Sequence, residues 1–143
     1  MASMEATSAD LEAVKQFAAQ TTRAVLVTRR KDGGLQSSPM AVVADDEGNV
    51  LTATRASSAK TYNLARDPRA MLCLFTERWP GPWLHIEGEA ALARLPEALP
   101  LLADYYRRRG QDTTTEAFRE RMLGENRVLI RITPQRVVPR PPQ

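Results

Sequence analysis

"TATRASSAKTYNLARDPRAMLCLF" (Thr52–Phe75) is the stretch that decides the fold, because it passes from one strand-like segment to another through a single short helix. Residues 50–55 are rich in strand-forming types, and the pattern of residues 57–67 predicts a helix that Pro68 stops. Residues 69–77 form the next predicted strand, and its almost entirely apolar middle predicts burial on both faces. This unit therefore supplies two strands and one helix around which the other segments can be ordered.

The segments on either side of this stretch are mostly further short strands, separated by hairpin-type turns such as "KDGG" and "DDEGN". Pro39 lies inside one of them and predicts a sheet edge or a bulge, because proline cannot donate to the strand ladder. Gly88 in a later strand predicts a bulge or a close approach of two backbones. Ser8 is the expected N-cap of the first helix, and Ser57 or Ser58 that of the short helix. The segments expected outside the opening stretch are helix 8–20, strands 23–30, 35–44 and 83–95, helices 96–109 and 113–123, and a last strand 127–138.

This order of elements predicts a mainly β (β+α) protein. Six short strands with only one helical crossover among the first five favour a six-stranded antiparallel barrel with flanking helices, because a doubly wound parallel sheet needs helices between most strands. The chain has 143 residues and shows neither an internal repeat nor an interdomain linker. We therefore expect a single domain over residues 1–143, with its core at about residues 10–138 and frayed ends.

The composition excludes several classes of protein. No apolar run approaches the ~18 residues that span a bilayer, and the net charge of +3 is scattered rather than gathered in a block. We expect neither a membrane nor a nucleic-acid partner. One cysteine, Cys73, and one histidine, His85, are too few for a structural zinc site, and we expect no metal, although the composition leaves an all-oxygen site open. The single cysteine and an N-terminal segment without a secretory pattern fit a reducing cytoplasm.

Lys60 stands in an unusual place for a cation. It is one of only three lysines among 20 basic residues, and it lies in the first turn of the predicted helix, where the helix dipole is positive. Free backbone N–H groups at a helix start, the hydroxyls of Ser57 and Ser58 and a lysine ammonium together suit a phosphate, which Arg55 could also approach. The residues alone leave two interpretations, a phosphate site or capping serines beside a solvated lysine.

The longer stretch "VLTATRASSAKTYNLARDPRAMLCLF" resembles the signature of the pyridoxamine-phosphate-oxidase-like, FMN-binding split-barrel superfamily. In that family a strand ending in Thr-x-x precedes a small-residue Ser/Arg-x-Lys turn, an Asn-Leu helix, an Asp-Pro-Arg-Ala corner and a buried strand. "RAVLVTRRKDGGLQSSPMAV", "WLHIEGEAALA" and "RVLIRITPQRVV" resemble its first hairpin, its Val/Ile-x-Gly-x-Ala strand and its last strand. The resemblance covers residues 10–138 and implies a split barrel that binds a flavin or deazaflavin at a homodimer interface.

The resemblance also implies which residues hold the cofactor. Residues 57–60 would bind its phosphate, and Trp83, or Trp79 in the preceding loop, would come from the partner subunit. The implied set comprises Ser37, Ser38, Pro39 and Met40 beside the ring, Thr52, Thr54 and Arg55 along the path to the phosphate, Ser57, Ser58, Ala59 and Lys60 at the phosphate, and Trp79 and Trp83.

Two branches of the family differ in cofactor. Pyridoxamine-phosphate oxidases use FMN and carry a C-terminal Trp-x-x-x-Arg-Leu-like segment, which "ITPQRVVPRPPQ" lacks. "AKTYNLARDPRA" is more similar to the compact branch, common in actinobacteria, that uses the deazaflavin coenzyme F420, whose anionic tail would meet Arg55, Lys60 and Arg66. That branch implies an F420H2-dependent reductase that transfers a hydride to a tetrapyrrole, quinone or enone-type acceptor. The alternatives are an FMN-dependent oxidoreductase of the same fold and a non-enzymatic dimer that binds a cofactor or haem.

The catalytic group stays unassigned, with His85 as a candidate proton donor and Tyr62, Tyr105 and Tyr106 as weaker candidates, because helical tyrosines more often pack. His85 shares a strand face with Trp83 and Glu87, and the competing interpretation is a hydrogen-bonded structural histidine. Cys73 lies among apolar residues and is expected in the core rather than as a nucleophile, because reactive thiols need an accessible, electropositive setting.

Overall fold

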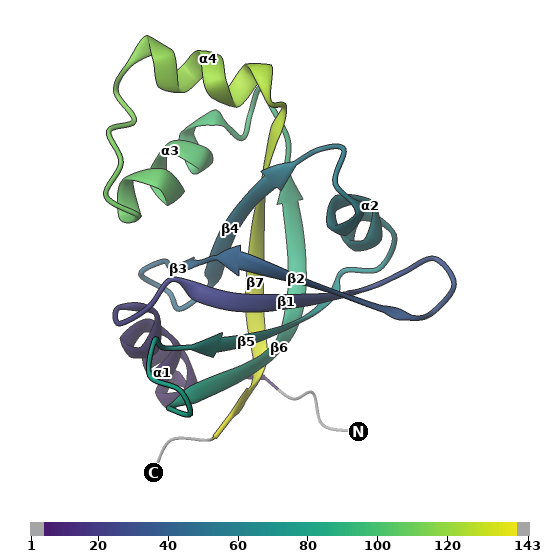
Figure 1. The fold of residues 1–143 in the computed structure, drawn as a ribbon, viewed down its shortest axis with the longest axis vertical. Helices are drawn as coiled ribbons and strands as arrows, with labels where there is room; N and C mark the ends of the chain where they lie inside the picture. Colours follow the sequence, from purple (N-terminus) through teal and green to yellow (C-terminus); the bar gives the residue numbers. More distant parts are fainter. Residues whose placement is uncertain (1–4, 140–143) are drawn as a thin grey trace.

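Seven strands form one curled antiparallel sheet in the computed structural model, which describes residues 5–139 (Figure 1). The strands lie in the order β2-β1-β5-β6-β7-β4-β3. The predicted mainly β architecture with flanking helices is confirmed, while the ends expected to fray, residues 1–4 and 140–143, lie outside the described residues. The elements are α1 (Ser8–Ala18), β1 (Arg23–Arg29), β2 (Leu35–Ala41), β3 (Val43–Ala44), β4 (Val50–Arg55), α2 (Ala59–Arg66), β5 (Arg69–Phe75), β6 (Trp83–Ala93), α3 (Leu99–Arg108), α4 (Glu116–Gly124) and β7 (Arg127–Val138).

The predicted strand 35–44 is two strands in the structure, which is why the sheet has seven strands instead of six. The chain leaves the ladder at Val42, whose N–H donates to the carbonyl of Thr22 over 2.8 Å. Pro39 lies on β2, which is an edge strand, as predicted. Both predictions for Gly88 are confirmed, because the ladder bulges between Glu87 and Gly88 and a Cβ at Gly88 would lie 2.3 Å from the carbonyl oxygen of Thr133.

The inner face of the sheet carries the main core. Every second residue of β1, β5 and the first half of β6 points inward and is buried, for example Leu26, Leu72 and Ile86, each with no exposed surface. Val14 of α1 and Leu64 of α2 pack into the same core from the two ends of the curled sheet (Figure 1). The N-cap of α1 is Thr7 rather than the predicted Ser8, because Thr7 and Asp10 exchange side-chain to backbone hydrogen bonds in a capping box.

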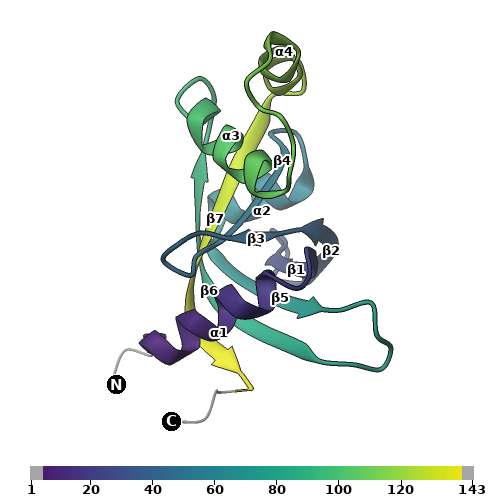
Figure 2. The same cartoon turned by 90° about the vertical axis from the view of Figure 1, so that its left-hand side faces the viewer.

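The outer face of the sheet is covered over only half of its width. The helix pair α3–α4 packs on β3, β4 and β7 and forms a second cluster around Leu102, Tyr105 and Met122 (Figure 2). Strand β4 is therefore the strand that is buried on both faces, with its first five residues buried. The same prediction for β5 was wrong, because no element among residues 5–139 covers its outer side.

The uncovered half of the outer face is called the open face below. On β5 it exposes Cys73, which the sequence had placed in the core, and leaves Met71 half-buried. Within residues 5–139, no helix is long and apolar enough to cross a membrane. The uncharged residues and His85 on the open face of β2, β1, β5 and β6 are Leu35, Ser37, Pro39, Val25, Val27, Met71, Cys73, Phe75, Trp83 and His85, and the charged Arg29, Arg69 and Glu87 lie on the same face.

Candidate functional site

The turn between β4 and α2 presents unused backbone donors. Ser58 has the extended N-cap conformation, and its carbonyl accepts the N–H of Thr61 over 3.1 Å. The N–H groups of Ser57, Ala59 and Lys60 have no hydrogen-bond partner within residues 5–139. Three free amides at the positive end of a helix dipole form a cradle for an anion.

The hydroxyls of this turn are used differently from the prediction. Ser58 Oγ accepts from Thr54 Oγ1 over 3.1 Å and lies 2.9 Å from Thr61 Oγ1, which donates to the carbonyl of Arg55. Ser58 therefore holds the N-cap position without capping α2 through its side chain. This chain of hydroxyls stiffens the turn, and Ser57 is left as the exposed hydroxyl that an anion can reach.

Lys60 is half-buried beside these amides and makes no ion pair or hydrogen bond with any residue in the described part of the chain. Arg55 is largely exposed and lies 3.9 Å from Glu125. The hydrogen bond from Arg127 lowers the pKa of Glu125, so this carboxylate stays ionised near the turn. Lys60 is therefore a cation without a partner among the described residues, whereas the charge of Arg55 is partly neutralised by Glu125.

Helix α2 is fixed by a buried amide. Asn63 Nδ2 donates to Thr28 Oγ1 over 3.1 Å, and both residues are buried. Arg66 donates to Asn63 Oδ1 and to the carbonyl of Arg29. Arg66 therefore fastens the end of α2 that is remote from Lys60, and its contacts do not support the expectation that it meets a cofactor tail.

The predicted residues on β4 and β2 fall into two groups. Thr52 is fully buried and donates to the carbonyl of Ala41 over 2.8 Å, so it ties two strands together and lines no open path, contrary to the prediction. On β2, Ser37 and Pro39 are exposed on the open face, while Ser38 is half-buried on the other side. Half-buried Met40 of β2 packs against the inner core. The beginning of β2 lies near α2, because Gln36 pairs with Thr28, the partner of Asn63.

The two tryptophans lie far from the turn within one protomer. Trp79 is 87% exposed in the loop between β5 and β6, and Trp83 is 49% exposed at the start of β6. Trp83 pairs with Phe75, at the end of β5 remote from α2. The 7 residues of β5 span roughly 20 Å at about 3.4 Å each. Trp83 therefore lies at the opposite end of β5 from helix α2.

His85 is held by a carboxylate on its own strand. His85 Nε2 lies 2.9 Å from Glu87 Oε2, and Arg136 of β7 pairs with the same carboxylate. The hydrogen bond from His85, followed by that from Arg136, holds the pKa of Glu87 below its usual range. This geometry favours the structural interpretation of His85. Among residues 5–139, no group of three or more His, Cys, Asp or Glu side chains is placed to hold a metal ion.

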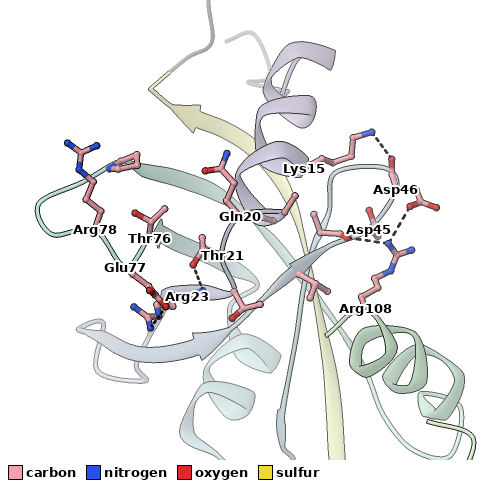
Figure 3. Close-up of a pocket in the computed structure, with 16 residues that line it drawn as sticks. Lys15, Gln20, Thr21, Arg23, Asp45, Asp46, Thr76, Glu77, Arg78 and Arg108 are labelled. Atoms are coloured by element: carbon pink, nitrogen blue, oxygen red, sulfur yellow. Dashed lines mark hydrogen bonds and ion pairs between the residues drawn. The ribbon is translucent and has the colours of Figure 1, made fainter. Parts of the chain in front are cut away.

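A large hollow, drawn in Figure 3, is lined by none of residues 57–60. It measures about 1060 Å³ and is formed by the end of α1, residues 20–23, the β3–β4 turn, the beginning of the β5–β6 loop and Arg108 of α3. None of the residues predicted to bind the cofactor lines it. Sequence analysis missed this hollow because its walls come from segments that are distant in the chain and carry no motif.

A curled antiparallel sheet with one crossover helix defines a split-barrel protein, and the start of that helix carries free amides and a lysine. The family model of pyridoxamine 5'-phosphate oxidase matches residues 11–139, and the chain belongs to this family. The comparison with curated proteins finds no match.

Solved structures show the same fold. A conserved hypothetical protein from Mycobacterium tuberculosis is 25% identical, with a TM-score of 0.71 over 96% of this chain and 86% of that chain. An F420 reductase is 20% identical, with a TM-score of 0.64 over 86% of this chain and 94% of that chain. A heme binding protein from Mycobacterium smegmatis is 17% identical, with a TM-score of 0.67 over 93% of this chain and 53% of that chain.

Proposed function

We propose that this protein is a cytoplasmic, homodimeric reductase that uses reduced deazaflavin (F420H2) to transfer a hydride to an unsaturated small molecule of the tetrapyrrole, quinone or enone type. The observation that carries the proposal is the turn of residues 57–60, where three amides and Lys60 lack partners among the described residues. A phosphate would satisfy all four groups at once. Family membership and the F420 reductase among the similar folds support this choice of ligand.

The residues of the turn fit a phosphate-bearing cofactor. The amides of Ser57, Ala59 and Lys60, the Ser57 hydroxyl and the Lys60 ammonium would hold the phosphate, while Thr54, Ser58 and Thr61 keep the turn in shape through their hydroxyl chain. The chemistry that the cofactor supplies when bound is hydride donation. The protein itself would bind the cofactor, orient it toward the acceptor and exclude water from the site.

A second copy completes the site in this proposal. The open face exposes apolar residues on four adjacent strands, and large uncovered apolar patches mark interaction surfaces. Trp79 and Trp83 are exposed and lie at the end of β5 remote from α2, and in the proposed dimer they contact the ring of the cofactor held by the partner. A twofold dimer through the open face would bring the tryptophans of each copy toward the other.

Two alternatives have their own support. The family is named for an oxidase and the turn binds one phosphate equally well in FMN, so an FMN enzyme is the first alternative. The similarity to a heme binding protein makes a non-enzymatic haem protein the second. In the protomer His85, the only histidine, is already bonded to Glu87, which weakens the case for haem.

Fluorescence titration of the purified homodimer with F420 and with FMN tests the proposal. We expect a colourless protein that binds the deazaflavin and, once the cofactor is reduced, oxidises it in the presence of an acceptor. Lys60→Ala should weaken binding, while the matched variant Lys31→Ala, in the exposed β1–β2 turn, should not. Yellow protein with bound flavin favours the FMN enzyme. A haem spectrum, or cofactor binding without turnover over a broad acceptor panel, favours the non-enzymatic protein.

A further inference from the structure

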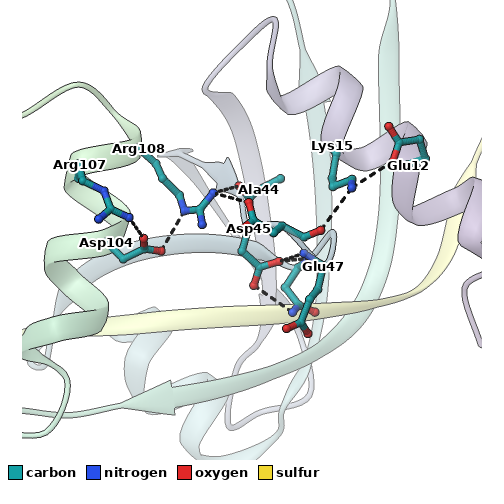
Figure 4. A network of polar contacts seen from close by, with 10 residues as sticks. Glu12, Lys15, Ala44, Asp45, Glu47, Asp104, Arg107 and Arg108 are labelled. Atoms are coloured by element: carbon teal, nitrogen blue, oxygen red, sulfur yellow. Dashed lines mark hydrogen bonds and ion pairs between the residues drawn. The ribbon is translucent and has the colours of Figure 1, made fainter.

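The hollow at the end of α1 has one wall of paired charges and one wall of polar groups without partners in the described residues. This difference indicates which kind of ligand the hollow can bind. One wall is a closed network of charges (Figure 4). Lys15 pairs with Glu12 and donates to the carbonyl of Asp46, while Arg108 bonds to Asp104, Asp46 and the carbonyl of Ala44. The cations of this wall are therefore already neutralised by partners within the protein.

The opposite wall has polar groups without partners. Thr76 Oγ1 is buried and has no hydrogen-bond partner in the described part of the chain. Arg78, Gln20 and Thr22 also make no side-chain hydrogen bond or ion pair with residues 5–139, and all three line the hollow. Arg23 pairs with Glu77, a residue whose side chain is 84% exposed. A buried hydroxyl without a partner costs free energy unless water or a ligand satisfies it.

The floor between the two walls is fixed in place. Thr21 Oγ1 donates to the carbonyl of Phe75 over 2.9 Å and accepts the N–H of Arg23. The carbonyl of Thr22 accepts the N–H of Val42. Because the corner of residues 21–22 is held from both sides, the hollow is formed before any ligand arrives, which lowers the ordering cost of binding.

We propose that this hollow binds an amphipathic organic anion, a molecule with one acidic group and an apolar body. The acidic group meets Arg78 and the exposed hydroxyl of Thr22, and the body lies on Ala19, Val43 and Pro82, which line the same space. The carboxyl end of α1 repels an anion from its side, so the acidic group is placed at the loop wall (Figure 3). The hollow shares no residue with the cofactor turn, but its loop wall carries Trp79 and Trp83, which the proposed function assigns to the partner's cofactor, so competition between probe and cofactor is part of the test.

The two tryptophans of the chain provide a local signal. Trp79 follows Arg78 directly, and Trp83 follows Pro82, so both lie beside the loop wall. The probe is 8-anilinonaphthalene-1-sulfonate, which has one sulfonate and an aromatic body and emits after energy transfer from tryptophan. Its uncharged relative N-phenyl-1-naphthylamine serves as the matched ligand without the acid.

The full-length protein, free of cofactor, is titrated with both probes. We expect saturable binding of the sulfonate, weakened roughly tenfold or more by Arg78→Gln and unchanged by Arg119→Gln, an exposed arginine on α4 outside the hollow. Ala19→Phe should obstruct the apolar surface on which the body lies and weaken binding of both probes. The uncharged probe should not distinguish Arg78→Gln from the wild type.

Several results would overturn the proposal. Equal affinities in Arg78→Gln and wild type show that the acid is not recognised there, and undiminished binding to Ala19→Phe shows that the probe lies elsewhere. Displacement of the sulfonate by the deazaflavin would make the hollow part of the cofactor site. Cofactor titration of Ala19→Phe separates the two proposals, because weakened probe binding with unchanged cofactor affinity supports this site whether or not the reductase proposal holds.

Discussion

The two halves of the outer sheet face have similar strands but opposite surroundings. On β4 and β7, outward residues such as Leu51 and Leu129 are buried under α3–α4. On β1 and β5, outward residues such as Val25 and Met71 have no cover from residues 5–139. The residue pattern of a strand therefore predicts that both of its faces are buried. It does not predict whether the element that buries the outer face belongs to the same chain or to a second one. The difference locates the surface where a second copy is expected.

The largest loss of stability should come from a substitution in the half of the outer sheet face that α3 and α4 cover. Leu102 on α3 has no exposed surface, so Leu102→Ala should lower the free energy of unfolding by about 2–5 kcal/mol. Val27→Ala on the open face should cost less than about 1 kcal/mol in dilute protein, since Val27 is only half-buried. Urea unfolding of both variants measures the contrast. Equal losses in dilute protein would mean that the two halves are equally buried.

A charge on the open face should separate the dimer. Val25 lies between Pro39 and Cys73 on the neighbouring strands, and a twofold interface would contain the change twice. We expect Val25→Glu to raise the dimer dissociation constant by roughly a hundredfold or more, about 2.7 kcal/mol. Light scattering should then return the chain mass of 15.9 kDa instead of twice that value.

Leu101→Glu is the control for this change, because Leu101 is an exposed apolar residue on α3, in the covered half. It should leave the mass at the dimer value. A wild-type protein that is monomeric at micromolar concentration would contradict the account of the open face altogether.

The next effect concerns the cofactor. Lys60→Ala should weaken cofactor binding about ten- to a hundredfold, roughly 1.5–3 kcal/mol, with unchanged melting and unchanged dimer mass. Val25→Glu should weaken cofactor binding as well, but only together with loss of the dimer. Fluorescence titration and light scattering on the same samples separate these two causes. Cofactor binding that survives in a monomeric Val25→Glu would place the whole site within one protomer.

The smallest expected effect is the difference in affinity between F420 and FMN. We expect F420 to bind up to about fivefold more tightly than FMN, roughly 1 kcal/mol, because its anionic tail extends past the shared phosphate toward Arg55, a single exposed cation. Contacts of exposed charges contribute only about 0.2–1 kcal/mol each and weaken with salt. Titrations at low and high ionic strength should therefore show a preference that shrinks with salt. If the preference for F420 over FMN does not change with salt, contacts to the cofactor ring and not to the anionic tail are the source of the selectivity.

Sequence reasoning worked best where structure is local. The helix that follows Ser58, the edge position of Pro39 and the bulge at Gly88 all depend on a few adjacent residues, and each was predicted. The burial of β5 was wrong because its apolar middle is the same whether the cover is a helix or a second chain. The N-cap was displaced by one residue because Thr7 and Ser8 suit that position equally in sequence.

The site was predicted in outline but not in its contacts. The turn of residues 57–60 carries its own motif, so its free amides could be expected. The carbonyl of Asn126, which accepts the N–H of Ala56, and the carboxylate of Glu125 reach the turn from the other end of the domain, and no spacing in the sequence reveals them. The internal use of the Ser58 hydroxyl and of Thr52 was likewise decided by packing.

Strand β7 lies between β6 and β4 and pairs with both, although it is the last element of the domain to be synthesised. Until it emerges from the ribosome, β4 has β3 as its only ladder partner among the described strands, and one long edge of β6 is unpaired. Pairing between strands so distant in the chain slows folding. The nascent domain must therefore wait for its final strand with aggregation-prone edges exposed, which makes chaperone protection during translation most valuable just before residues 127–138 appear.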